Sequence, residues 1–158
     1  MTSQTAEYAL RATIFLAEHA DRAPFRVGDL ADALDAPRNY LSKILHALAK
    51  AGVLSSARGP AGGFRLAVDA AELPLIRIVA LFDPVEEGRR CVLGREKCSD
   101  ANPCGAHARW KRVAEQVASF FRTTTVADVV ASSRVAGTGR NGQSRAKNGV
   151  RGGGDVAA

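Results

Sequence analysis

The chain contains three cysteines, and they lie close together in the sequence. Cys91, Cys98 and Cys104 are spaced by six and five residues, and His107 follows three positions after the last of them. Soft thiolate ligands suit zinc or an iron–sulfur cluster, and such groups usually have four protein ligands. We therefore expect the three cysteines to hold a metal or a cluster, with His107 as the local candidate for the fourth ligand.

Two other kinds of cysteine chemistry fit the same residues. A structural zinc ion could take three cysteines and a histidine, although zinc sites generally use closer Cys-x-x-Cys pairs and this sequence has none. A metal-free switch, in which oxidation joins two cysteines, is the third reading. The spacing favours a cluster over zinc, and both alternatives stay open at this point.

Apolar periodicity predicts three helices ahead of these cysteines. The first covers about residues 5 to 20, the second about 27 to 34, and the third begins near Pro37 and ends at Gly52. Only a tight turn separates the last two helices. Together they are typical of a helix-turn-helix.

A change of period after Gly52 predicts a β-hairpin. Residues 53–56 and 64–66 form its strands, and a tip rich in glycine and proline joins them. Arg58 and Arg65 place positive charge on this arm, and its glycines let the backbone approach a partner closely. A basic hairpin directly after a helix-turn-helix is a wing, so we expect a winged-helix domain.

The exposed face of the third helix and the wing are our candidate DNA-contacting surface. The helix offers side chains that can bond phosphates and base edges in the major groove. The alternative is a polar helix face that is merely solvated. The predicted helix contacts are Arg38, Asn39, Tyr40, Ser42 and Lys43, with His46 on the same face, and the predicted wing contacts are Arg58, Gly59, Gly62, Gly63 and Arg65.

The second half of the chain predicts an arrangement for pairing two copies. A short apolar helix over residues 73–82 precedes a cysteine-bearing loop over 83–105. A long amphipathic helix and a short closing helix then extend to residue 131, and the apolar stripe of the long helix is too large to leave in water. It packs on its own domain or also on a second copy, and we expect the second copy and hence a homodimer. The stripe consists of Trp110, Val113, Ala114, Val117, Phe120 and Phe121.

Composition sets limits on the remaining classes of protein. The net charge of +6 lies mostly in residues 132–158, which contain five basic residues and one acidic residue. Residues 1–131 therefore carry only +2. This glycine-rich segment predicts a disordered basic tail. There is no signal-peptide pattern and no apolar run of about 18 residues, so we expect a cytoplasmic protein with reduced thiols and no membrane partner.

Several sequence blocks resemble the Rrf-type family of bacterial winged-helix regulators, which includes IscR and NsrR. The resemblance covers about residues 5 to 131, and its most specific part is the arginine- and glycine-rich wing. The blocks are Tyr8-Ala9-Leu10-Arg11, Asn39-Tyr40-Leu41, Ala51-Gly52-Val53-Leu54 and Arg58 through Leu66. One difference is Ser42, since IscR-like members carry a glutamate there, so their operator preference does not transfer.

The resemblance implies a dimeric transcription factor with a [2Fe-2S] cluster on Cys91, Cys98, Cys104 and His107. The first cysteine spacing is one residue longer here than in IscR-like members. In nitric-oxide-sensing relatives an acidic residue of the partner subunit's first helix replaces the histidine, and Glu7 stands at the matching position.

We therefore predict a mainly α-helical, DNA-binding regulator, a repressor, whose operator binding depends on a cluster that senses redox state, nitric oxide or iron–sulfur supply. The remote alternative is an iron–sulfur electron carrier or enzyme. The sequence has no glycine-rich phosphate loop opening a helix, no nucleophile elbow and no paired carboxylates in an evident cleft, so we do not expect an enzyme.

Overall fold

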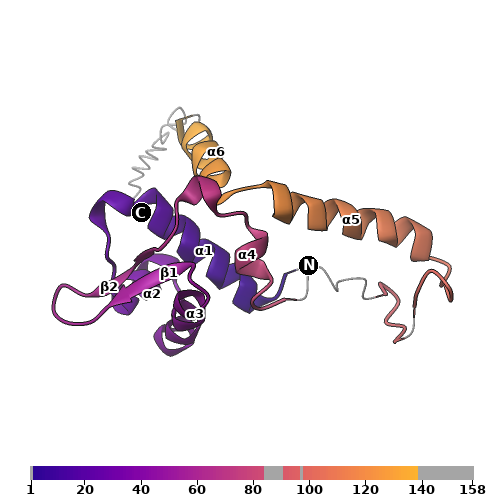
Figure 1. Ribbon diagram of the computed structural model, residues 1–158, viewed down its shortest axis with the longest axis horizontal. Coiled ribbons are helices and arrows are strands. Elements are labelled where there is room, and N and C mark those ends of the chain that lie inside the picture. The colour runs from indigo at the N-terminus through magenta and orange to yellow at the C-terminus, as the bar shows by residue number, and fades with distance from the viewer. Residues whose placement is uncertain (1, 84–90, 97, 139–158) are drawn as a thin grey trace, which may run out of the picture.

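Three helices build the N-terminal half of the protein, whose computed structural model describes residues 2–83, 91–96 and 98–138. Helix α1 (Gln4–Glu18) begins at Ser3, whose Oγ accepts a hydrogen bond from the Ala6 N–H at 3.2 Å. Helices α2 (Val27–Leu34) and α3 (Arg38–Lys50) pack against α1, as Figure 1 shows. The predicted spans of all three helices are confirmed within two residues.

The turn between α2 and α3 has a defined geometry. Asp35 adopts a left-handed conformation with φ of 49°, and the Ala36 N–H donates to the Ala31 carbonyl at 2.9 Å. Arg11 of α1 donates to the Leu34 carbonyl at 2.7 Å and so satisfies an acceptor at the end of α2. The helix-turn-helix is therefore fastened to α1 at its turn.

The predicted wing is an antiparallel hairpin of β1 (Leu54–Ala57) and β2 (Gly63–Leu66). Its register pairs Leu54 with Leu66 and Ala57 with Gly63. Phe64 also pairs with Phe25, which lies just before α2. This extra bridge joins the base of the wing to the helix-turn-helix.

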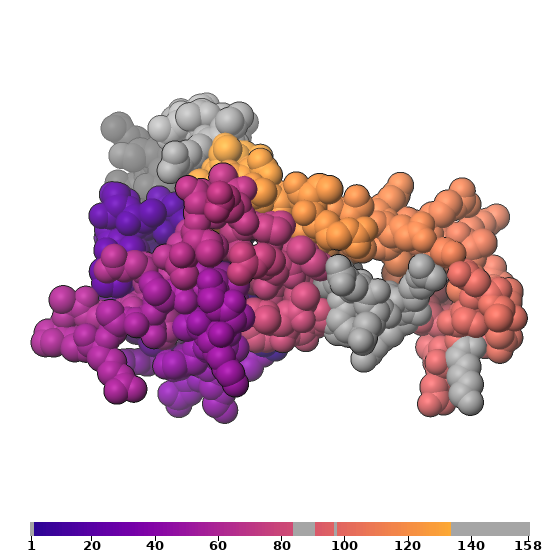
Figure 2. Space-filling model, in the orientation of Figure 1, coloured from indigo at the N-terminus to yellow at the C-terminus, as the bar shows by residue number. Residues whose placement is uncertain are grey.

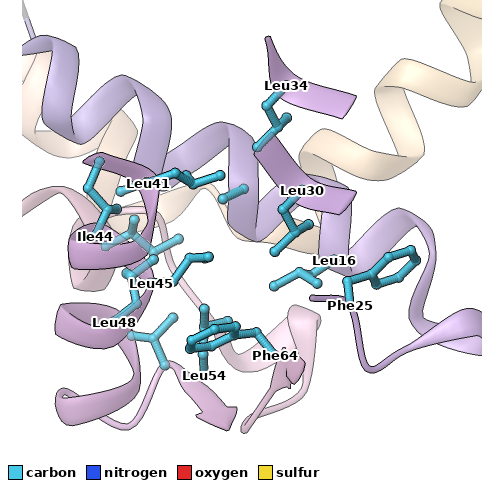
Figure 3. Close-up of a cluster of buried hydrophobic side chains, with 14 of the residues drawn as sticks. Leu16, Phe25, Leu30, Leu34, Leu41, Ile44, Leu45, Leu48, Leu54 and Phe64 are labelled. Carbon is cyan, nitrogen blue, oxygen red and sulfur yellow. The ribbon is translucent and has the colours of Figure 1, made fainter. Parts of the chain in front are cut away.

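One apolar core holds these elements together. Side chains from α1, α2, α3 and the wing meet in it, as Figure 3 shows. Burial of a leucine side chain is worth about 1.5–3 kcal/mol relative to leaving it exposed, so this core fixes how α3 and the wing sit relative to each other. The labelled core residues are Leu16, Phe25, Leu30, Leu34, Leu41, Ile44, Leu45, Leu48, Leu54 and Phe64.

The sequence predicted a short apolar helix over residues 73–82, and these bounds were wrong. A 3-10 helix covers Ala70–Glu72, and helix α4 covers only Ile76–Val79. Residues on either side of Pro74 pair with another segment instead: the Leu75 N–H donates to the Thr124 carbonyl at 2.9 Å, and the Val126 N–H donates to the Leu73 carbonyl at 2.9 Å. Leu73 therefore lies outside the helix, and Leu75 is the N-cap from which α4 begins.

Helix α5 (His107–Thr123) projects from the body of the protein as an arm, drawn as an orange ribbon in Figure 1 and as orange atoms in Figure 2. Ala118 is its only buried residue. Helix α6 (Val126–Thr138) returns to α1 and buries Val126 and Val130. In the described part of the chain no helix is long and apolar enough to span a membrane.

Helix α6 also corrects the predicted start of the tail. Residues 132–138 are helical, whereas we predicted a disordered tail from residue 132. The hydroxyls of Ser132 and Ser133 donate to the carbonyls of Asp128 and Val129 at 2.9 and 3.0 Å. The rest of the predicted tail, 139–158, and positions 84–90 and 97 of the predicted cysteine loop lie outside the described residues.

Candidate metal centre and nucleic-acid interface

The three cysteines converge as the spacing predicted. Their Sγ atoms lie within 4.8 Å of one another, and those of Cys91 and Cys104 are 3.4 Å apart. His107, the first residue of α5, places Nδ1 3.2 Å from the Cys98 Sγ. The three thiols and His107 line a small pocket together with Trp110 and Lys111. Three soft ligands with an adjacent imidazole fit zinc or an iron–sulfur cluster.

Short turns bring the thiols together. The Gly94 N–H donates to the Cys91 carbonyl at 2.8 Å, and Gly94 has a positive φ of 72°, which glycine adopts without strain. The Ser99–Asn102 pair closes a second turn between Cys98 and Cys104. The His107 N–H donates to the Cys104 carbonyl at 3.0 Å. The site therefore lies at the point where the loop becomes α5.

The environment separates the pKa values of two of these thiols. A hydrogen bond from the Arg95 backbone lowers the pKa of Cys91 to about 7, helped by the Leu93 backbone and the other two thiols and opposed by burial. The Cys104 backbone lowers the pKa of Cys98, but burial and the neighbouring thiols outweigh it, and the pKa is raised overall. Cys91 is therefore nearer than Cys98 to its metal-binding thiolate form at neutral pH.

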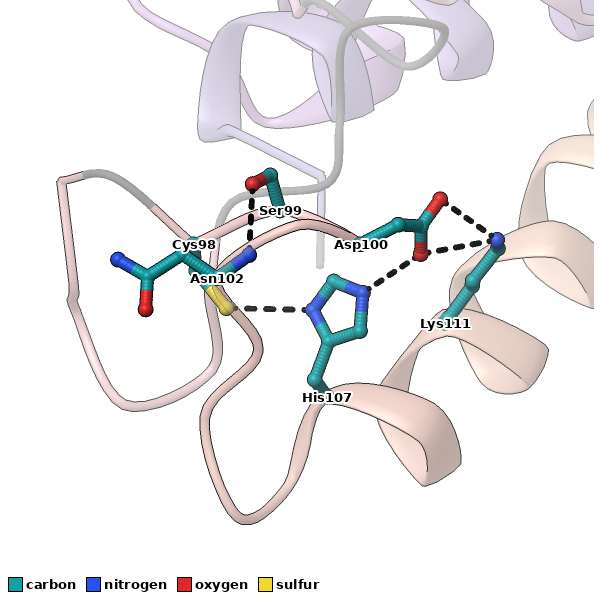
Figure 4. Close-up of polar contacts among 6 residues, drawn as sticks. All are labelled: Cys98, Ser99, Asp100, Asn102, His107 and Lys111. Atoms are coloured by element: carbon teal, nitrogen blue, oxygen red, sulfur yellow. Dashed lines mark hydrogen bonds and ion pairs between the residues drawn. The ribbon is translucent and has the colours of Figure 1, made fainter.

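Two residues beside His107 were missed in the sequence. Asp100 accepts a hydrogen bond from His107 Nε2 at 2.9 Å, and Lys111 Nζ contacts both Asp100 carboxylate oxygens at 3.0 and 3.1 Å (Figure 4). The available sequence signal was an acid between the last two cysteines and a lysine one helical turn after the histidine.

Glu7, the alternative fourth ligand, lies elsewhere in the chain. It is in the first turn of α1, its side chain is exposed, and its Oε1 lies 3.7 Å from Arg11 Nη1. Among the described residues, the group of converging ligand atoms consists of the three cysteines; His107 lies 3.2 Å from the Cys98 Sγ, and no contact joins Glu7 to the thiols. A ligand role for Glu7 therefore requires a second subunit, and the choice between Glu7 and His107 stays a prediction.

The predicted DNA-contacting face of α3 is exposed and free of acidic residues. Arg38, Asn39 and Lys43 point their side chains to solvent, and Ser42 is half-buried. His46 is also exposed, and its ring lies edge-on to Phe64 of the wing with the centroids 5.4 Å apart. This face has the charge that a DNA backbone requires.

Tyr40 has a contact within the protein as well. Its hydroxyl lies 2.5 Å from the Thr5 hydroxyl, and its ring packs edge-on to Tyr8 at a centroid distance of 5.9 Å. The side chain is 37% exposed, so one edge stays accessible. Its proposed DNA contact stays a prediction.

The wing glycines divide into two kinds. Gly59 lies in open space with a positive φ of 99°, whereas Gly62 is buried. A Cβ on Gly62 would lie 2.2 Å from the Ala57 carbonyl oxygen, and one on Gly63 would lie 2.5 Å from the Phe25 carbonyl oxygen. Gly62 and Gly63 are therefore needed to close the wing and dock its base, whatever contact they make with DNA.

Arg58 and Arg65 are both exposed on the wing, as predicted. A further arginine was missed. Arg26, just before α2, donates to the Pro60 carbonyl at the wing tip and so adds a positive charge there. Its position in the sequence, far from the wing, gave no indication of this contact.

This fold and site define a winged helix-turn-helix DNA-binding protein with a cysteine-rich appendage on its α5 arm. Residues 2–132 match the Rrf2 family, described as an iron-dependent transcriptional regulator. The chain belongs to the Rrf2 family, which confirms the resemblance inferred from its sequence, and it is a transcriptional regulator and not an enzyme.

Individual relatives agree with this assignment. The chain is 37% identical over 130 residues to a putative HTH-type transcriptional regulator of Aquifex aeolicus, covering 81% of this chain and 90% of the relative. It is 30% identical over 145 residues to the HTH-type transcriptional regulator IscR of Photorhabdus laumondii, covering 90% and 88% of the two chains.

Solved structures share the fold. CymR, the global cysteine regulator of B. subtilis, matches with a TM-score of 0.69 and 20% identity over 84% of this chain and 97% of its own. T. potens IscR matches with a TM-score of 0.68 and 21% identity over 91% and 93% of the two chains. These likenesses confirm the predicted winged-helix architecture.

Proposed function

We propose that the protein is a homodimeric repressor whose affinity for its operator is set by a [2Fe-2S] cluster bound through Cys91, Cys98, Cys104 and His107. The observation that carries the proposal is the convergence of three thiols within 4.8 Å, with the imidazole of His107 3.2 Å from one of them. The description of the family as an iron-dependent transcriptional regulator agrees with iron chemistry at this site.

A bound cluster would supply one-electron redox chemistry and a centre that oxidants, nitric oxide or iron shortage can remove. The protein's part is to hold it with three thiolates and one nitrogen. A nitrogen ligand exchanges more readily than a thiolate, which suits a sensor. The lowered pKa of Cys91, caused chiefly by the Arg95 backbone, favours thiolate ligation at neutral pH.

The dimer part of the proposal depends on α5. Val113, Val117 and Phe120 are 45%, 46% and 53% exposed and lie on one side of the helix. An apolar stripe on a projecting helix is costly to hydrate, and a second copy with the same stripe would cover it. Two α3 helices would then be held at a fixed spacing for two operator half-sites.

Contacts of α1 join Asp83, where the predicted cysteine-bearing loop begins, to α3. The Ser3 N–H, at the cap of α1, donates to the Asp83 carboxylate at 2.7 Å, and Asp83 stands at the start of the cysteine-bearing loop. On the same helix Thr5 contacts Tyr40 of α3. A change in the loop could therefore shift α3 through α1, and coupling of this kind typically amounts to about 1–3 kcal/mol.

One observation favours the zinc alternative. With Zn–S bonds of about 2.3 Å, the sulfurs of a tetrahedral zinc site lie about 3.8 Å apart. The separations in this protein, from 3.4 Å for one pair up to a limit of 4.8 Å, include that value. A structural zinc would hold the α5 arm against its loop and would give no redox response.

Anaerobic purification tests the proposal. We expect a red-brown protein with about two irons and two sulfides per chain, and loss of both in Cys98→Ala but not in Val92→Ala, an exposed position of the same loop. DNA duplexes selected from a random library should then bind the loaded and cluster-free proteins with different affinities. A colourless protein with one zinc per chain, or equal affinities for all duplexes, would overturn it.

A further inference from the structure

Asp100 and Lys111 form a polar network on the outer side of His107, away from the thiols. The ring of His107 lies between Cys98 on its Nδ1 side and Asp100 on its Nε2 side, as Figure 4 shows. The His107 side chain is 12% exposed, whereas that of Asp100 is 59% exposed. Exposed ion pairs contribute little to folding, so this network needs another explanation.

The contact with Asp100 favours one nitrogen of His107 as the metal ligand. A carboxylate accepts hydrogen bonds, so Asp100 Oδ1, which lies 2.9 Å from Nε2, favours the tautomer whose proton is on Nε2. In the neutral imidazole the lone pair is then on Nδ1, the atom 3.2 Å from the Cys98 sulfur. The carboxylate therefore selects the tautomer whose free lone pair points at the thiol group.

The elements around Asp100 hold it in place. Asp100 lies in the turn closed by Ser99 and Asn102, where the Asn102 N–H donates to the Ser99 carbonyl at 3.1 Å. Lys111 follows His107 by four residues, one turn along α5, and holds both carboxylate oxygens. Turn and helix thus fix the carboxylate from two directions.

We propose that Asp100, held by Lys111, is a positioning residue that keeps His107 as an Nδ1 ligand of the metal group. Carboxylate–histidine–metal arrangements of this kind orient the ring, raise the basicity of the ligand nitrogen and typically account for about 10–100-fold in metal affinity. The inference rests on the proposed function, because it assigns a role toward the group bound by the three thiols.

Its first consequence is spectroscopic. The full-length protein is purified anaerobically, reduced, and examined by pulsed electron paramagnetic resonance for coupling to a ligand nitrogen. We expect the coupling in the wild type, its loss in His107→Ala, and a changed or missing coupling in Asp100→Ala with iron and sulfide retained. Asp100→Asn keeps an oxygen acceptor for Nε2–H and should restore most of the wild-type coupling.

The second consequence is cluster lifetime. Asp100→Ala should lose its cluster to a chelator about 10–100-fold faster than the wild type, and Lys111→Met should show a smaller effect in the same direction. Glu96→Ala, which removes an exposed carboxylate of the same loop, is the matched control and should behave as wild type. Far-UV circular dichroism checks that every variant is folded.

The outcomes separate this inference from the proposed function. A wild type that holds a cluster without nitrogen coupling, or an Asp100→Ala variant with wild-type coupling and lifetime, would overturn the inference alone. A wild type without iron or sulfide would overturn both.

Discussion

The hydroxyl of Tyr40 lies 2.5 Å from that of Thr5, and this contact joins the exposed face of α3 to the start of α1. Tyr40 was predicted from the sequence as a DNA contact, yet the contacts the structure gives it are with α1. The cap of the same helix α1 contacts Asp83, where the predicted cysteine-bearing loop begins.

Removing the Tyr40 hydroxyl should therefore affect stability more than DNA binding. We expect Tyr40→Phe to lower the free energy of unfolding by about 0.5–1.5 kcal/mol, the net worth of a typical hydrogen bond, and to change DNA affinity only slightly. Urea unfolding and fluorescence anisotropy measure the two quantities. Thr5→Val should reproduce the loss without adding to it in the double variant. A large loss of affinity at unchanged stability would instead indicate a direct DNA contact.

Gly62→Ala should destabilise the wing. Its Cβ would meet the Ala57 carbonyl oxygen at 2.2 Å, so the backbone must move. We expect a loss of about 1–3 kcal/mol in the free energy of unfolding, as for other overpacked sites. Gly105→Ala, where nothing lies within 4 Å of the added Cβ, is the control and should stay within about 0.5 kcal/mol of wild type. Equal stabilities for the two variants would contradict this role for Gly62.

Salt dependence tests the wing as a phosphate-contacting element. Replacement of the exposed Arg58 by alanine should weaken binding to all duplexes alike and reduce the slope of log affinity against log salt by about 1. Anisotropy titrations at several salt concentrations give this slope. Arg112→Ala, an exposed cation on α5, should leave it unchanged. If both variants had the wild-type slope, the wing would not contact phosphates through Arg58.

The exposed apolar stripe of α5 predicts that a charge introduced into it will prevent two copies of the chain from associating. Val117→Glu should convert a dimer to a monomer in sedimentation velocity, because a carboxylate would have to enter an apolar interface. Gln116→Glu adds the same charge at the adjacent exposed position and serves as the control. A wild type that sediments as a monomer at all concentrations would refute the dimer.

The cap of α6 predicts a dependence on pH. Hydrogen bonds from the Thr125 backbone and hydroxyl lower the pKa of Asp128 below its ordinary value of 3.8. A carboxyl whose pKa is lowered on folding stabilises the protein above its unfolded-state pKa, and this stability is lost as the pH falls through the folded-state pKa. Asp128→Ala should therefore lower the melting temperature at pH 7.

The difference from wild type should shrink as the pH falls below about 4, where the unfolded-state carboxyl is protonated, and should vanish below the folded-state pKa, where the carboxyl is protonated in both states. Thermal melts followed by circular dichroism between pH 3 and 7 measure this difference. Glu115→Ala, an exposed acid on α5, is the control. A constant difference at all pH values would show that the carboxylate charge is not involved.

The sequence predicted well those elements whose buried apolar residues repeat at regular intervals within one short segment. Leu41, Ile44, Leu45 and Leu48 repeat at helical intervals and are all buried on α3. The error at α4 has the opposite cause: residues 73–75 pair with residues some fifty positions later, and no local pattern reveals such a pairing. Propensity is overridden there by tertiary contacts.

In the candidate metal site, too, residues close together in the sequence were predicted and residues brought together only by folding were missed. The convergence of the three cysteines and the place of His107 beside Cys98 could be predicted because their residue types and close spacing are typical of a ligand set. Asp100 was missed because an acid in a turn is common, and only the folded loop places it beside His107 Nε2. Arg26 was missed for the same reason, since its contact with the wing tip spans 34 positions.

Because α5 has a single buried residue, a newly synthesised chain should be susceptible to proteolysis along this helix. A helix with so few tertiary contacts opens locally at little free-energy cost, and cellular proteases cleave such openings. Each chain that has not yet met a second copy would therefore be open to degradation along this arm. Synthesis and turnover would then compete, and a regulator of this design would accumulate only above a threshold rate of expression.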